Sequence, residues 1–119
     1  MKQRILVLNG QRIVQMESGE RGVWHNEKVE RAGSLQPGLY SLDSAVSASA
    51  RQSDTLSGPI VHTDDLHVYQ QIGKSLVRHD TAHFDKLPVA GRIVSIQYDA
   101  AGKATSAAAV ASLARGRTR

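Results

Sequence analysis

The sequence has no cysteine, which excludes disulfides, thiolate nucleophiles, cysteine-based zinc sites and iron–sulfur clusters. No apolar run approaches the ~20 residues that a membrane-spanning helix needs. The charged start, Met1 to Arg4, has no apolar signal segment behind it, so we expect a cytoplasmic protein without membrane association. Only five of the 119 residues are aromatic, and the core must consist mainly of Val, Ile, Leu and Ala. This length fits one compact domain or two very small units that share a core, and it excludes a large enzyme.

Acidic residues are absent from the C-terminal end, and most of the net charge of +4 resides there. Residues 1–103 carry 12 Lys and Arg against 11 Asp and Glu. Residues 104–119 carry no acid and three arginines, which are Arg115, Arg117 and Arg119. The body is therefore nearly neutral, and the tail alone supplies only weak, salt-sensitive attraction to nucleic acid.

Apolar runs and turn residues predict a mainly β fold with short helices. Two apolar runs flank Asn9-Gly10, a pair typical of tight hairpins because both central positions take positive φ. Asn26 is a predicted N-cap for a short helix over Glu27 to Ala32. Pro37-Gly38 is a predicted turn that leads into a strand over Leu39 to Leu42.

The chain also resembles itself at an offset of about 55 residues, which is a signal for an internal repeat. The matched landmarks are Ile5 with Ile60, Asn9-Gly10 with Asp64-Asp65, Gln15 with Gln70, His25-Asn26 with His79-Asp80, and Tyr40 with Val94. We therefore predict an internal duplication, with two similar units that each resemble a small SH3-like or OB-like barrel. Units this small are expected to bury apolar surface against each other or through a homodimer.

The predicted organisation is a β unit at residues 1–43, a linker at 44–57, a second β unit at 58–103, and an Ala-rich segment with a basic tail at 104–119. The linker is small and polar and shows no apolar periodicity. Two structures remain open for residues 104–114. Lys103 to Ala109 fits an edge strand against Ile93 to Tyr98, whereas the run of alanines favours a helix.

Histidine and aspartate are concentrated in the predicted hairpin turn of the second unit. His62, Asp64, Asp65 and His67 are residue types that bind divalent metals. We favour turn geometry, because small polar residues are what such a turn requires, and this interpretation makes His62 and His67 exposed strand positions. No metal site is predicted.

The His-Asp pair at residues 79–80 is of a type that performs acid–base catalysis. Because Asn26 occupies the place of Asp80 in the other unit, a helix cap is the preferred interpretation. The sequence has no nucleophile elbow and no phosphate-binding glycine loop. We predict no catalytic residue and no cofactor, and we expect that the protein is not an enzyme.

Aromatic and basic side chains suggest a second possible function, nucleic-acid binding by a small β-barrel that places aromatic residues beside basic ones. The candidate contacts are Arg12, Arg78, Trp24, Tyr69, Arg115, Arg117 and Arg119. In the alternative interpretation, Tyr69 and Tyr98 cap the core with their hydroxyls in water, and Trp24 packs over its own helix.

The second unit resembles the KfrB domain of plasmids and other mobile elements. The residues that carry the resemblance are Gly58-Pro59, Tyr69-Gln70, Val77-Arg78-His79 and the strand from Gly91 to Tyr98. The resemblance implies a non-enzymatic accessory protein of plasmid maintenance that acts through protein contacts. It further implies a DNA-binding coiled-coil protein of the KfrA type as the partner. It brings no catalytic, cofactor or metal-binding residues.

Overall fold

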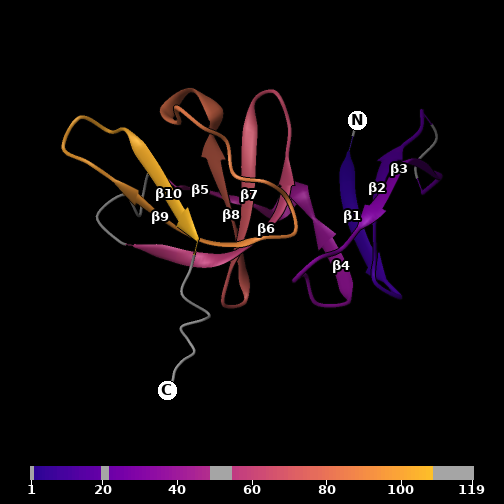
Figure 1. The fold of residues 1–119 in the computed structure, drawn as a ribbon. Coiled ribbons are helices and arrows are strands. Elements are labelled where there is room, and N and C mark those ends of the chain that lie inside the picture. The colour runs from indigo at the N-terminus through magenta and orange to yellow at the C-terminus, as the bar shows by residue number, and fades with distance from the viewer. Residues whose placement is uncertain (1, 20–21, 49–54, 109–119) are drawn as a thin grey trace, which may run out of the picture.

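The computed structural model describes residues 2–19, 22–48 and 55–108, and in these residues the chain is mainly β. Two sheets lie side by side (Figure 1), one with four strands in the order β3-β2-β1-β4 and one with six in the order β10-β9-β6-β7-β8-β5. The strands are β1 (Gln3–Leu8), β2 (Gln11–Glu17), β3 (Trp24–Arg31), β4 (Gly38–Ser41), β5 (Val46–Ser47), β6 (Leu56–Thr63), β7 (His67–Ile72), β8 (Ser75–Asp80), β9 (Ile93–Tyr98) and β10 (Ala104–Ala108). The predicted mainly β fold class is confirmed.

Two 3-10 helices, η1 (Leu42–Ser44) and η3 (Thr81–His83), complete the described elements. No described helix is long and apolar enough to cross a membrane. Neither sheet closes into a barrel within the described residues. A single parallel bridge joins Phe84, which follows η3, to Ala104 of β10, without a further ladder.

The first sheet is built around the predicted hairpin. Asn9 and Gly10 have φ values of 54° and 75°, the left-handed conformation that this turn requires at both positions. β1 pairs with β2 on one side and with β4 on the other. Ile5, Val7 and Val14 from β1 and β2 are buried on the inner face, toward the second unit.

The helix predicted for Glu27 to Ala32 is wrong, because these residues belong largely to β3, which runs antiparallel to β2. Asn26 caps no helix, and its side-chain oxygen accepts a hydrogen bond of 2.8 Å from Gln15 on β2. β3 lies at the edge of the sheet, and nearly all its residues are exposed. A central strand shows alternating apolar residues, but an exposed edge strand carries charged and polar residues instead. The alternation that indicates a strand was therefore absent from this segment of the sequence.

The second sheet holds β6 between β7 and β9. After β8, η3 follows Asp80, but the Asp80 side chain makes no capping hydrogen bond, so the capping role predicted for it is wrong. β10 pairs with β9, which confirms the strand alternative for Ala104 to Ala108. Within the predicted linker, β5 pairs in parallel with β8. Residues 49–54 and 109–119 lie outside the described residues.

One apolar cluster joins the two units. Val61, Tyr69 and Leu76 of the second unit pack with inner-face residues of the first. The backbones also meet, since the Ser34 N–H donates to the Gly91 carbonyl at 2.8 Å. The two units therefore bury apolar surface against each other and share a core.

Candidate functional site

The residues predicted to contact nucleic acid do not form one surface. Arg12 and Tyr69 are buried, with 3% of Arg12 exposed. Trp24 and Arg78 are half-buried on β3 and β8, which belong to different sheets. Trp24 lies on a strand and packs against Arg4, whose guanidinium carbon is 3.9 Å from the ring centre, so the packing over a helix predicted for it is wrong. The tail positions Arg115, Arg117 and Arg119 lie outside the described residues.

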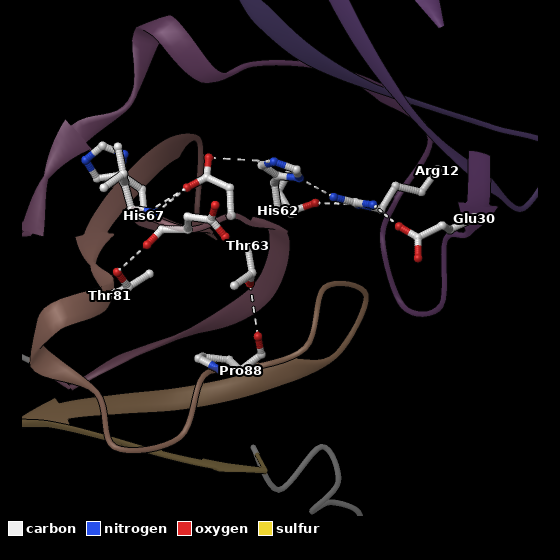
Figure 2. Close-up of polar contacts among 11 residues, drawn as sticks. Arg12, Glu30, His62, Thr63, His67, Thr81 and Pro88 are labelled. Atoms are coloured by element: carbon white, nitrogen blue, oxygen red, sulfur yellow. Dashed lines mark hydrogen bonds and ion pairs between the residues drawn. The ribbon is translucent and has the colours of Figure 1, made fainter. Parts of the chain in front are cut away.

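Arg12 instead connects the two sheets (Figure 2). From β2, its Nε donates to the Val61 carbonyl of β6 at 2.7 Å, and its Nη2 donates to Nδ1 of His62. Its Nη1 donates to Glu30 on β3 at 2.8 Å. Burial lowers the pKa of Arg12 and the Glu30 charge opposes this, so the guanidinium remains charged.

A β-bulge in β6 explains why Val61 is available to Arg12. Ile60 pairs with Gln70 and His62 pairs with Tyr69, so Val61 is an extra residue without a partner in this ladder. A buried carbonyl outside the ladder must find another donor. Arg12 supplies that donor from the other sheet.

His62 is 8% exposed, so the prediction of an exposed strand position is wrong. Its Nδ1 accepts from Arg12, and the hydrogen of the neutral ring is therefore on Nε2. Nε2 is buried and makes no hydrogen bond within the described residues, with Asp64 Oδ2 3.8 Å away. Burial and the Arg12 charge lower the pKa of His62 to about 4, although Asp64 acts in the opposite direction. His62 is thus neutral at neutral pH.

Asp64 forms the turn between β6 and β7. Its Oδ1 accepts hydrogen bonds from the backbone N–H groups of Leu66 at 2.9 Å and His67 at 2.8 Å. Asp64 therefore has the turn role that the sequence favoured. Across the described part of the chain, no group of three or more potential metal ligands is present.

A cleft of about 270 Å³ opens beside Arg12, between the inner side of β3 and the chain that precedes β9. Thr63 donates to the Pro88 carbonyl at 3.0 Å, which fastens this chain to the end of β6 (Figure 2). The charged residues that line the cleft are Arg12, Lys28, Arg31 and Glu30. On the inner face, Arg12 and Lys28 outnumber the one carboxylate, Glu30, so the cleft attracts anionic groups.

A second surface is an apolar row on the outer face of the first sheet. Leu6 pairs with Ile13 and with Leu39, and Ile13 pairs with Val29, so one residue from each strand stands in line. Directly paired residues share a face, and this face is opposite to the buried Ile5. Val29 is 52% exposed and Leu39 56%. We call these four residues the outer row.

The second unit also contains a buried polar network that the sequence did not reveal. Gln70 and His79 are both fully buried. The Gln70 amide nitrogen donates to backbone carbonyls of Leu56, Gly58 and Val94, at 3.0 to 3.2 Å. Its oxygen accepts from His79 Nε2 at 2.9 Å. This network joins four strands, β6, β7, β8 and β9, and has a structural role.

The tautomer of His79 follows from this network. Because Nε2 donates to Gln70, Nδ1 accepts from the Tyr98 hydroxyl at 2.6 Å. The Tyr98 hydroxyl was predicted to lie in water, but it donates to a buried ring, so that prediction is wrong. Tyr69, for which the same role was predicted, packs in the apolar cluster that joins the two units. Burial lowers the pKa of His79 to about 4 and raises the pKa of Tyr98 to about 12.

Comparison with known proteins finds a family similarity for the second unit. Residues 55–108 match the model of the KfrB domain, which confirms the resemblance drawn from the sequence. Protein TraB from Escherichia coli is 32% identical over 96 residues, which are 80% of this chain and 64% of TraB. The chain therefore spans less than two thirds of the length of this relative. Together the two similarities indicate a plasmid-associated protein.

Proposed function

Because residues 55–108 match the model of the KfrB domain, we propose that the protein is a non-enzymatic accessory factor of plasmid maintenance that acts as a protein-interaction module. The observation that supports this most directly is the outer row. Apolar side chains aligned across all four strands, two of them more than half exposed, are typical of a surface that a protein partner covers.

The partner that we propose is a coiled-coil protein of the KfrA type, which docks a helix on the outer row. Four strands at a spacing of ~4.8 Å give a row about 14 Å long, which matches about ten residues of helix. A helix presents apolar side chains at intervals of three and four residues along such a length. On the same face, a polar row beside the outer row contains Arg4, Gln15 and Asn26, which are linked by hydrogen bonds of 2.7 and 2.8 Å.

The test is binding of the full chain to the KfrA-type protein of the same plasmid, measured by calorimetry. Leu39→Asp places a charge in the outer row, and we expect the affinity to fall at least about tenfold. Leu66→Asp is the matched control, because Leu66 is 70% exposed but lies in the β6–β7 turn, away from the first sheet. Equal binding by both variants and by the unmodified chain would show that the outer row is not the interface.

Nucleic-acid binding is the competing outcome. It would appear as association with a generic DNA or RNA probe that weakens steeply with salt and is lost on deletion of residues 115–119. The burial of Arg12 and Tyr69 removes two of its candidate contacts from the surface. A partner held by the outer row is expected to stay bound as the salt concentration rises, because apolar contacts are not screened.

A further inference from the structure

We propose that the cleft beside β3 binds an acidic peptide segment of a protein partner, with a carboxylate held between Arg12 and Lys28. The inference rests on the proposed function only in that the ligand belongs to a protein. It concerns a different surface from the outer row, because Lys28 pairs with the inward-facing Val14.

The charges of the cleft are not balanced internally. Glu30 is the one carboxylate in its lining, and it accepts from Arg12 at 2.8 Å. The same Glu30 oxygen is 3.9 Å from the Lys28 ammonium, so one acid serves two cations. Arg31 also borders the cleft, but it pairs with Gln11 and so stands on the same face of β3 as Val29. A second carboxylate would complete this arrangement.

Arg12 gives the cleft a preorganised floor. Its contacts with Val61, Glu30 and His62 use three of its five N–H groups and hold the guanidinium in one position. A flexible arginine loses side-chain entropy when it binds a ligand, but here folding has already fixed it. With 97% of its surface buried, Arg12 also acts in a medium where charges attract more strongly than in water.

The opposite wall favours a peptide over other anions. It consists of Pro88, Val89 and Ala90, and Val89 is 62% exposed. Aliphatic side chains next to an acidic residue would pack on this wall. Among the described residues no Trp, Tyr or Phe lines the cleft, and the ring that does, His62, is only 8% exposed, so it presents little of its face for a base to stack on.

The experiment is a titration of the isotope-labelled full chain with a blocked Val-Glu-Val-Glu-Val peptide, followed by amide NMR shifts. We expect the largest shifts at Lys28, Arg31, Thr63 and Val89. A matched Val-Lys-Val-Lys-Val peptide should cause none. Charge reversal by Lys28→Glu should weaken binding at least about tenfold. Lys74→Glu, an exposed lysine in the β7–β8 turn, should leave it unchanged.

Three results would overturn the proposal: no shifts at the cleft, equal shifts with the lysine peptide, or equal affinity for inorganic phosphate. The Leu39→Asp variant separates this inference from the proposed function. It should bind the acidic peptide normally while it loses the coiled-coil partner. If the charge reversal leaves peptide binding intact and Leu39→Asp still loses the partner, only the cleft proposal fails.

Discussion

The two sheets use the same strand order and yet differ in how they are buried. The first sheet has the order β3-β2-β1-β4, and four neighbouring strands of the second have the corresponding order β8-β7-β6-β9. In each set, the first strand of a hairpin, β1 or β6, lies between its hairpin partner and the last strand of the set. The pairing registers differ. Tyr40 pairs with Ile5 in the first sheet, whereas Val94 pairs with Gly58 in the second.

The surroundings of these matched residues differ as well. Tyr40 is half-buried and its hydroxyl donates to the Gln36 carbonyl at 2.6 Å, while Val94 is buried in an apolar cluster. The internal duplication is therefore not confirmed, and the shared strand order is compatible with it. The comparison shows that one strand order is compatible with two kinds of sheet. The first sheet has exposed apolar residues on its outer face, and the second contains a buried polar network.

The largest effect is expected at Gly58, on the central strand of the second sheet. A Cβ atom there would lie 2.0 Å from the Gln71 carbonyl oxygen, and the backbone of a paired strand has little freedom to move away. Gly58→Ala should lower the free energy of unfolding by more than about 3 kcal/mol. Gly19→Ala, where nothing lies within 4 Å, is the control in the first unit. Chemical denaturation measures both, and equal effects would contradict the difference in packing.

Gln15 and Gln70, matched in the sequence, provide the next comparison. Gln70→Leu leaves three carbonyls of two strands and the ring of His79 without their partner, and should cost about 2 to 3 kcal/mol. Gln15→Leu removes only contacts with Arg4 and Asn26 on the outer face and should cost less than about 0.5 kcal/mol. The same denaturation experiment tests this, and similar losses would mean that the buried network contributes little.

The dependence of stability on pH should also separate the two units. The pKa of His79 is about 4 in the folded chain, below the ordinary value of 6.5, so the unfolded chain binds more protons between these values. The free energy of unfolding should therefore be fully maintained above pH 6.5 and fall with acidification, by about 2 kcal/mol for His79 between pH 7 and 5.

His62 should also lower the free energy of unfolding on acidification, since its pKa in the folded chain is likewise lowered to about 4. His79→Gln should flatten the profile at the cost of overall stability, whereas His25→Gln, on the exposed β3, should leave it unchanged. Urea denaturation at several pH values provides the measurement. A profile that stays equally steep without His79 would show that its burial is not the cause.

The sequence predicted what depends on local signals. The Asn9-Gly10 hairpin and the strand after Pro37-Gly38 rest on turn residues and nearby apolar runs, whereas for Ala104 to Ala108 such signals left a strand and a helix open. β3 was mistaken for a helix because an exposed edge strand has no apolar alternation, and Asn26 is equally suited to a cap.

The candidate site was less predictable, because its features depend on contacts between distant segments. Arg12 was considered as a surface residue, and only the bulge at Val61 shows why a buried guanidinium belongs there. A bulge has no reliable signature in one sequence. The burial of His62 follows from the same bulge and was missed for the same reason.

That bulge also links the evolution of two positions 49 residues apart. Loss of the extra residue would return β6 to regular pairing, leave no spare carbonyl and turn the following side chains to the opposite face. A guanidinium at position 12 would then be a buried charge that has lost its hydrogen-bond partners on β6. Homologues should therefore gain or lose the insertion and the arginine together.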